Sequence, residues 1–328
     1  ALIGPWNYPL LQISWKVAPA LVAGCSFIIK PSELSPSTAI HLMKLLEEAG
    51  LPKGVINMVH GGKDIVQALC KNPLSKGLLF TGSYKAGKQL SRIMAEYPEK
   101  ILALELGGNN PLVVWSTRKI NAAVDLIFES AFISSGQRCT CARRLILPNS
   151  KSGKMILTNL KKKIQSLSYT NESDLYYGPL ISPAATKGFL DYQAKLTQLG
   201  AKPILKARKV NNSFNLVTPS LMNITDMRKV YDEENFGPML QVQFVDTFED
   251  AIEDNVRAEI LNKSSEGDTH IVKIKILGNN TANDLLNAVL SKVKIKSFRE
   301  LIPTMNEIFI KVVGEENIEE ALKPEHTE

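Results

Sequence analysis

The sequence lacks long hydrophobic runs and paired cysteines. Its longest uncharged apolar run covers residues 17–29, between Lys16 and Lys30, and is too short to span a bilayer. The four cysteines, at positions 25, 70, 139 and 141, show no disulfide framework, which favours a reducing compartment. No signal peptide is recognisable. We therefore expect a cytoplasmic protein that does not insert into membranes.

The patterns of metal and nucleic-acid sites are also missing. Cys139 and Cys141 have no second pair of cysteines or histidines at zinc spacing, so we expect no metal site. The net charge is +6 and the pI about 9.0, but the lysines are dispersed. Their densest run, residues 161–163, has no interleaved aromatic residues and is typical of a solvated helix face. We expect no nucleic-acid partner.

Size and composition indicate a globular protein of more than one domain. The chain has 328 residues, of which 44% are hydrophobic and 22% charged, enough for two or three domains. It begins at Ala1 inside an apolar, strand-like run, without an initiator methionine. We therefore expect a fragment that lacks the N-terminal part of a longer protein.

Residues 1–105 alternate between strand-like and helix-like segments. Strands are predicted at 25–29, 55–59, 77–81 and 101–105, and helices at 39–49, 64–70 and 84–96, with Ser37 capping the first of these. Strands that alternate with helices predict an α/β fold with a parallel, Rossmann-like sheet.

The alternation continues in residues 106–258, and the character of the chain then changes. The later strands are predicted at 112–115, 143–147 and 240–244, and the helices at 121–134, 151–167 and 182–199. Residues 261–268 are polar and resemble a linker. After them, a strand at 270–277, a helix at 281–290, a strand at 292–298 and a helix at 303–313 predict a small βαβα module. The predicted boundaries are 1–105, 106–258 and 259–328.

A glycine-containing loop covers residues 82–89, GSYKAGKQ. It is one residue from a Walker A motif, but Gln89 replaces the Ser or Thr that would bind magnesium, which disfavours a kinase or ATPase. A strand-to-helix turn of this kind still suits a dinucleotide, because the helix N-terminus offers unpaired N–H groups to a pyrophosphate. The usual G-x-G-x-x-G pattern is absent.

Two segments contain a candidate base and a candidate nucleophile. Glu105 lies in the apolar, glycine-bounded run 104–111, and Cys139 follows Gly-Gln-Arg. Covalent catalysis needs both groups, although a lone cysteine is most often a small buried hydrophobe. Asn7 lies between two prolines, where plain turn chemistry is the simpler interpretation.

Together, the motifs of residues 1 to about 255 resemble the NAD(P)-dependent aldehyde dehydrogenases. They are GPWNYP (4–9), KPSE (30–33), FTGS (80–83), ELGG (105–108), GQRC (136–139) and ENFGP (234–238). The resemblance implies oxidation of an aldehyde to a carboxylate through a cysteine thiohemiacetal and a thioester. In this family Cys139 matches the nucleophile, and Glu105 matches the general base, which its apolar neighbours are expected to desolvate. Asn7 matches the oxyanion-binding amide.

The same resemblance implies an NAD site. Lys30 and Glu33 match the groups that hold the adenosine ribose, and Glu33 favours NAD over NADP because its charge repels a 2′-phosphate. The other residues that match cofactor contacts are Trp6, Gly82, Ser83, Gly87, Leu106, Glu234 and Phe236. Gly82 and Ser83 correspond to the pyrophosphate loop, Glu234 to the nicotinamide-ribose contact, and Phe236 to a neighbour of the nicotinamide ring.

Finer details resemble one branch of the family. Asn109-Asn110 and the run 139–144, CTCARR, are most similar to enzymes that oxidise N-succinylglutamate 5-semialdehyde in arginine catabolism. Arg138, Arg143 and Arg144 suit an anionic substrate, but strand packing and surface ion pairs are the simpler interpretation for at least two of them.

The C-terminal part departs from the family. The expected Pro-Phe-Gly-Gly region and oligomerisation strand do not follow Asp254, so the homo-oligomer usual in the family is not predicted. The tail instead resembles the C-terminal accessory region of ABC-2-type transporter ATP-binding subunits. Two alternatives stay open: a working NAD-dependent dehydrogenase with a small aldehyde substrate, or an inactive truncated dehydrogenase fused to an accessory module. A transporter-associated role is disfavoured by the incomplete Walker A motif.

Overall fold

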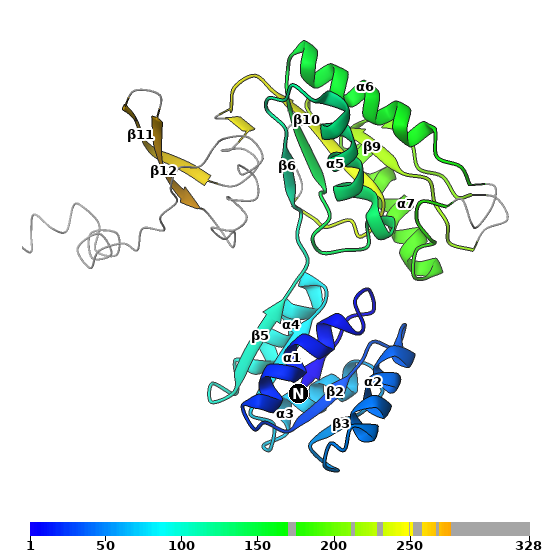
Figure 1. Ribbon diagram of the computed structural model, residues 1–328, viewed down its shortest axis with the longest axis vertical. Coiled ribbons are helices and arrows are strands. Elements are labelled where there is room, and N and C mark those ends of the chain that lie inside the picture. Colours follow the sequence, from blue (N-terminus) through cyan, green and yellow to red (C-terminus); the bar gives the residue numbers. More distant parts are fainter. Residues whose placement is uncertain are drawn as a thin grey trace, which may run out of the picture. The chain divides into compact units, whose positions relative to one another are not determined.

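The computed structural model describes residues 1–169, 175–210, 214–227, 232–248, 250–251, 258–266 and 269–276. The chain divides into two compact units, Ala1–Ala258 and Glu259–Glu328 (Figure 1). The candidate site lies in the first unit, which contains two five-stranded sheets.

The first sheet is entirely parallel, with the strand order β3-β2-β1-β4-β5 (Figure 1, blue to cyan). Its strands are β1 (Leu2–Ile3), β2 (Phe27–Lys30), β3 (Ile56–Met58), β4 (Gly77–Thr81) and β5 (Ile101–Glu105). Its helices are α1 (Leu11–Val22), α2 (Pro36–Glu48), α3 (Lys63–Lys71) and α4 (Tyr84–Met94). The parallel α/β fold expected from the alternating pattern is confirmed.

Strand β1 lies at the centre of this sheet, and its two side chains face opposite sides. Leu2 packs in a cluster with Ile13 of α1 and Ala39 of α2. Ile3 packs with Cys70 of α3 and Leu90 of α4. Helices therefore cover both faces. Because the chain winds outward from β1 in both directions, the carboxyl ends of β1 and β4 form a topological switch point, where such sheets bind ligands.

The second sheet has the order β6-β7-β10-β9-β8, parallel except for the β8–β9 pair. Its strands are β6 (Pro111–Val113), β7 (Arg144–Pro148), β8 (Lys202–Leu205), β9 (Ser220–Asn223) and β10 (Met239–Val245). Its helices are α5 (Ile120–Phe132), the short 3-10 helix η1 (Ile133–Gly136), α6 (Lys151–Gln165) and α7 (Pro183–Gln198). Leu240 of β10 packs with residues of α5 and α6, whereas its neighbour Met239 packs with residues of α7.

Serine side chains begin three of the helices. Ser83 accepts a hydrogen bond from the Ala86 amide at the start of α4, Ser150 from Gly153 at the start of α6, and Ser182 from Ala185 at the start of α7. Each satisfies an amide that has no partner within its helix. The expected cap of α2 at Ser37 is wrong: Ser35 holds the cap position, and Ser37 lies inside the helix, because Pro36 suits the first helical turn.

The polar segment at 261–268 is not the expected linker along its whole length. Strand β11 (Ala258–Glu266) pairs with β12 (Thr269–Ile276). Backbone groups supply the hydrogen bonds of a strand pair, so polar side chains do not prevent it. The predicted elements at 281–290, 292–298 and 303–313 lie outside the described residues.

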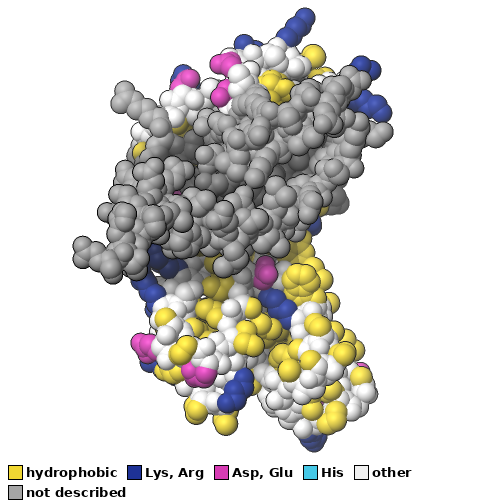
Figure 2. Space-filling view, turned by 90° about the vertical axis from the view of Figure 1, so that its left-hand side faces the viewer, with side chains coloured by type: hydrophobic (Ala, Val, Ile, Leu, Met, Phe, Trp, Pro, Cys, Tyr) yellow, Lys and Arg dark blue, Asp and Glu magenta, His cyan; other side chains and the backbone are white. Residues whose placement is uncertain are grey.

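Surface exposure differs between the two sheets of the first unit. Large exposed hydrophobic side chains in residues 1–105 include Trp15, Val22 and Ile101, and Figure 2 shows hydrophobic side chains across the lower part of the view, where the first sheet lies. Among the described residues of 106–258, fewer large hydrophobic side chains are exposed, namely Leu126, Met155, Leu199 and Phe214. Among the described residues, no helix is both long and apolar enough to cross a membrane.

Candidate active site

The backbone that leads to Cys139 adopts an unusual left-handed conformation. Ser134, Ser135 and Gly136 follow α5 with φ angles of 53°, 60° and 67°. Such angles are costly for residues other than glycine. The buried Ser135 hydroxyl donates a hydrogen bond of 2.5 Å to the Gly178 carbonyl, which stabilises the turn. A side chain at Gly136 would place its Cβ 2.2 Å from the Gly237 carbonyl oxygen, so this position requires glycine.

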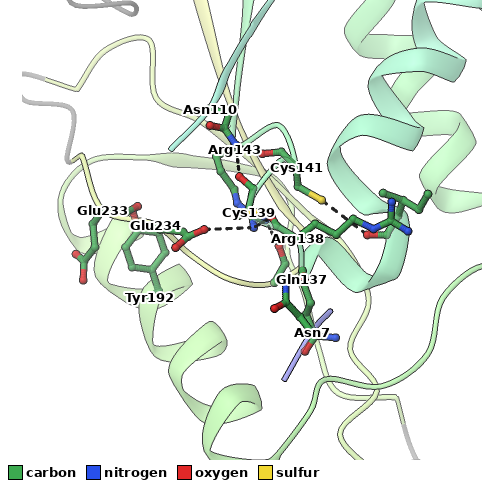
Figure 3. Close-up of polar contacts among 12 residues, drawn as sticks. Asn7, Asn110, Gln137, Arg138, Cys139, Cys141, Arg143, Tyr192, Glu233 and Glu234 are labelled. Atoms are coloured by element: carbon green, nitrogen blue, oxygen red, sulfur yellow. Dashed lines mark hydrogen bonds and ion pairs between the residues drawn. The ribbon is translucent and has the colours of Figure 1, made fainter. Parts of the chain in front are cut away.

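Asn110 holds the far side of the same loop. Its side-chain amide donates to the Cys139 carbonyl at 2.6 Å and to the Cys141 carbonyl at 3.0 Å (Figure 3). Its own carbonyl accepts hydrogen bonds from the amides of Arg143 and Arg144. Asn110 thus positions the cysteine loop, a role that the sequence motif alone did not reveal.

Arg143 is a buried clamp between two loops. Its side chain is 1% exposed, and it donates to the Arg138 carbonyl at 2.9 Å and to the Gly237 carbonyl at 3.1 Å. The guanidinium also stacks on Phe236, with 5.4 Å between its central carbon and the ring centroid. Because it is buried and occupied in this way, Arg143 stabilises the loops and does not offer a free cation to a substrate.

Glu234 lies between Arg143 and the ELGG motif. Its Oε1 atom is 3.9 Å from Arg143 Nη2, and a Cβ atom at Gly107 would be 1.7 Å from its Oε2 atom. This proximity explains why the motif has a glycine at position 107. Burial raises the pKa of Glu234, against the opposing effects of Arg143 and the Gly108 backbone.

The Glu234 carboxylate also has unused hydrogen-bonding capacity. Its Oε1 atom is buried without a hydrogen-bond partner, and such an acceptor is costly unless a donor satisfies it. A sugar hydroxyl is a donor of the right kind. The residues present therefore fit the ribose contact expected of Glu234.

Cys139 is half-buried at the centre of the site. Burial is the main cause that raises the pKa of its thiol, and the negative charges of Glu234 and Glu105 add to this effect, while backbone hydrogen bonds oppose it. The thiolate is the reactive form, so this thiol needs a base to take its proton.

Asn7 reaches the cysteine loop from the other end of the chain. Its side-chain amide donates to the Gln137 carbonyl at 3.0 Å (Figure 3). An amide nitrogen has two hydrogens, so one remains for another acceptor. The structure therefore brings Asn7 beside the loop of Cys139, which the simpler interpretation of a turn residue did not predict.

Glu105 does not have the desolvated surroundings expected from its apolar neighbours. Side chains along β5 alternate between exposed and half-buried, and Glu105 is on the exposed side. Apolar residues next to it in sequence point to the other face of the strand. The expectation failed because sequence neighbours in a strand are not spatial neighbours.

Lys16 of α1 is a residue near Glu105 that the motifs did not single out. It is half-buried and donates a hydrogen bond to the Thr81 hydroxyl at the end of β4. Burial lowers the pKa of Lys16, and the charge of Glu105 opposes this effect. A lysine within a mostly apolar helix was the available signal.

Lys30 and Glu33 form a pair at the carboxyl end of β2. The buried Lys30 ammonium is 2.7 Å from Glu33 Oε1 and 3.0 Å from the Pro31 carbonyl oxygen. Partial burial would raise the pKa of Glu33, but the hydrogen bond and charge of Lys30 lower it overall. The carboxylate is therefore held ionised and ordered, as a ligand for ribose hydroxyls requires.

Most of the remaining residues expected to contact the cofactor lie close to one another in pairs. Trp6 and Phe236 form an edge-to-face pair with centroids 5.5 Å apart. A Cβ atom at Gly87 would be 2.5 Å from Leu106, so α4 approaches the ELGG motif closely at this glycine. A Cβ at Gly82 would be 2.5 Å from the Phe80 ring. Among the described residues no cluster of three or more potential metal ligands occurs.

Two family models of known proteins match parts of this chain. The model of the aldehyde dehydrogenase family matches residues 1–268. A second family model, the C-terminal domain of DrrA1-3-like ATP-binding proteins, matches residues 232–313. The tail is therefore similar to a region of ATP-binding proteins, as its sequence indicated.

Curated relatives match most of this chain, but the match covers only about half of each relative. The N-succinylglutamate 5-semialdehyde dehydrogenase of Escherichia coli K12 is 43% identical over 255 residues, which are 77% of this chain and 52% of the relative. The enzyme of the same name from Cronobacter sakazakii is 44% identical over 256 residues, again 77% and 52%. The chain thus spans about half the length of these relatives.

Solved structures show the same relationship. Betaine aldehyde dehydrogenase from Staphylococcus aureus, in complex with NAD+, is similar with a TM-score of 0.73 and 31% identity, over 78% of this chain and 52% of the other. Methylmalonate-semialdehyde dehydrogenase from Oceanimonas doudoroffii is similar with a TM-score of 0.72 and 30% identity. The match covers 78% of this chain and 53% of that enzyme.

Proposed function

Because the chain belongs to the aldehyde dehydrogenase family, we propose that Ala1–Ala258 contains the centre of an NAD-dependent aldehyde oxidation. The observation that carries the proposal is the convergence on one loop: Asn7 bonds to Gln137 on one side of Cys139, and Arg143 and Glu234 lie on the other. Residues 1–105 would bind the cofactor, and residues 106–258 would supply the nucleophile.

The residues that would hold NAD are those at the ends of the first-sheet strands and beside Arg143. Lys30 and Glu33 would bind the adenosine ribose, and the ionised Glu33 disfavours a 2′-phosphate. Gly82, Ser83 and the N-terminus of α4 would bind the pyrophosphate. Gly87 and Leu106 shape the adjoining surface. Glu234 would accept a hydrogen bond from the nicotinamide ribose, near the Trp6–Phe236 pair. When bound, NAD supplies the acceptor for the hydride.

The proposed acylation step uses Cys139 and Asn7. The Cys139 thiol loses its proton to a nearby carboxylate, and its sulfur bonds to the aldehyde carbon. The carbonyl oxygen gains the negative charge and accepts hydrogen bonds from the second Asn7 N–H and the Cys139 amide, a stabilisation made where charge develops. Loss of hydride from that carbon then leaves a thioester on Cys139.

The proposed deacylation step uses Glu105. Its exposed position gives it access to water, and it takes a proton as the water attacks the thioester carbon. The carbon–sulfur bond breaks and the thiolate returns, while the carboxylic acid gives its remaining proton to solvent and leaves as the carboxylate. Lys16, whose ammonium interacts electrostatically with Glu105, is a neighbouring cation of this base.

The substrate is proposed to be N-succinylglutamate 5-semialdehyde, which would place the enzyme in arginine catabolism. The named relatives, at 43% to 44% identity, support this choice. A free, reactive Cys139 also suits a reducing compartment such as the cytoplasm.

The test is NADH formation by the purified chain with NAD and this semialdehyde. Cys139→Ala should abolish turnover. Asn7→Ala should lower kcat about 100-fold, the usual effect of removing one oxyanion donor. Glu105→Gln should still release NADH in a first turnover but stop afterwards. A folded chain that binds NADH yet shows neither turnover nor a first-turnover burst would contradict the proposal and favour the inactive alternative.

A further inference from the structure

Arg138, the residue directly before Cys139, has a guanidinium group that is only partly used. Its Nε atom donates to the Ser134 hydroxyl at 2.9 Å, and its central carbon is 5.5 Å from the centroid of the Tyr8 ring. Within the part of the chain that the structure describes, the group forms no ion pair and its two terminal nitrogens have no hydrogen-bond partner. Two N–H-bearing nitrogens thus remain for a ligand.

The neighbouring arginines differ from Arg138 in this respect. Arg143 is buried and donates to two carbonyl groups. Arg144 donates from Nε to the Asn109 carbonyl at 3.1 Å and lies at the start of β7. In the view of Figure 3, the Arg138 side chain extends away from Glu234, the carboxylate that is paired with Arg143. Of the three arginines, Arg138 is therefore the one suited to bind an anion.

Tyr8, the aromatic neighbour of Arg138, lies in a hollow that also contains Asn7, the proposed oxyanion-binding residue. The hollow has a volume of about 310 Å³ and is lined by neutral residues: Asn7, Tyr8, Pro9, Leu10, Leu11 and Ser14. Tyr8 belongs to this lining and lies under the Arg138 guanidinium. An anion that entered the hollow would meet no carboxylate in its lining, and the cation that stacks on Tyr8 of this lining is Arg138.

The geometry also holds the guanidinium in place before a ligand arrives. The Ser134 hydroxyl and the Tyr8 ring each restrict one part of the side chain, and stacking on an aromatic ring favours the planar arginine over lysine. The remaining fork matches the two oxygens of a carboxylate. An ordered fork loses less side-chain freedom on binding than a mobile one.

We propose that Arg138 binds a carboxylate of the substrate remote from its aldehyde, and so selects carboxylate-bearing aldehydes over neutral ones. This inference rests on the proposed function, because it assigns part of the same site. Arg138 is one residue from Cys139, so a carboxylate on the fork is held a short chain away from an aldehyde at the sulfur. Arg138 is a specificity residue and takes no part in bond making.

The test compares two aldehydes in three variants of the full chain. The substrates are N-succinylglutamate 5-semialdehyde and the uncharged hexanal. In Arg138→Met, kcat/KM for the semialdehyde should fall about 10- to 100-fold, the effect of one charge-assisted pair, mainly through KM. The value for hexanal should change less than about 3-fold. Arg138→Lys should recover part of the loss, because it restores charge without the fork. An equal loss for both aldehydes would show a role in loop structure only and overturn the inference.

Arg92→Met is the matched control for net charge. Arg92 is exposed in the last turn of α4, and its removal lowers the charge by the same amount. Both aldehydes should react as in the unaltered chain. If Arg92→Met reproduced the loss seen with Arg138→Met, general attraction by the positive protein would explain the preference.

A binding measurement separates failure of this inference from failure of the proposed function. The probe is N-succinylglutamate, titrated calorimetrically into the full chain in the presence of NADH and in its absence. Arg138→Met should weaken binding about 10-fold or more, whether or not the chain turns over. Equal affinity in both proteins, or no binding to the unaltered chain, would overturn the inference even if hexanal were oxidised in a Cys139-dependent way.

Discussion

Residues 1–105 and residues 106–258 each bury one cation beside a carboxylate, and they do so differently. Lys30 is paired with Glu33, three positions away, and the Glu33 side chain is 55% exposed. Arg143 is paired with Glu234, far along the chain, and that side chain is only 20% exposed. The Lys30–Glu33 pair orders the end of β2, and water can replace Lys30 as the partner of Glu33. The Arg143–Glu234 pair joins the loops that contain Cys139 and Glu234, and water does not easily reach either side chain.

This difference extends to the way each region shapes the site. The first region presents strand ends, a helix N-terminus and glycines to the site. The second holds its loop with buried polar side chains, of which Ser135, Arg143 and Asn235 are examples. Replacing one of these buried polar side chains should therefore disturb both fold and site, whereas a change in the first region should often disturb binding alone.

The largest expected effect comes from the backbone under the nucleophile. Gly136→Ala combines a φ of +67° with a Cβ 2.2 Å from the Gly237 carbonyl oxygen, so we expect a loss of about 4 kcal/mol of unfolding free energy, or failure to fold. Gly24→Ala, with a φ of +72° but open space, should cost only about 1 kcal/mol. Urea unfolding followed by circular dichroism measures both. Equal losses would break the comparison between the regions.

The two buried cations provide the second test. Arg143→Met leaves Glu234 buried without its partner and should cost about 3 kcal/mol. Lys30→Met leaves Glu33, which solvent can reach, and should cost about 1 kcal/mol or less. The midpoints of urea unfolding, measured under identical conditions, rank the two. A larger effect of Lys30→Met would show that burial of the partner does not decide the cost.

The third test separates binding from folding at the ELGG motif. Gly107→Ala would place a Cβ 1.7 Å from Glu234 Oε2. The carboxylate can rotate away, so we expect little change in stability but an NADH dissociation constant raised about 10-fold, equal to about 1.4 kcal/mol. Fluorescence titration with NADH measures this. Gly178→Ala, which has open space around it, is the control and should bind NADH normally; a matching loss there would remove the explanation for Gly107.

The smallest expected effect concerns the thiol. Because the charge of Glu234 contributes to the raised pKa of Cys139, Glu234→Gln should lower that pKa and increase the thiolate fraction at pH 8. Alkylation of Cys139 by iodoacetamide should then become about 2- to 3-fold faster. The experiment needs a Cys25→Ser background, since Cys25 is exposed and would react as well. Glu33→Gln is the control; an unchanged or slower rate in Glu234→Gln relative to it would contradict the assigned cause.

Local patterns predicted much of the fold. The strands at 77–81 and 101–105 have the predicted bounds, because each is a short apolar run between clear turn signals. Strands β8 and β9 were not predicted, since their short runs KPIL and SLMN depend on pairing with each other and with β10. The polar strand β11 was taken for a linker for the same reason.

The candidate site was likewise predicted only in part. Motifs identified Asn7, Glu105 and Cys139, but they did not reveal that Asn110 and Arg143 hold the cysteine loop in place. Asn110 Nδ2 contacts a carbonyl 29 positions away, and Arg143 Nη1 one that is 94 positions away. No periodicity or spacing records such distances.

The sequence by itself determined the parallel α/β architecture of residues 1–105, the family and the candidate nucleophile, because these depend on residues close together along the chain. The tertiary structure decided which side chains surround that nucleophile. It exposed Glu105, buried Arg143 beside Glu234 and Phe236, and left the two terminal nitrogens of Arg138 without a hydrogen-bond partner among the described residues. Burial and charge depend on neighbours that only the packed chain brings together.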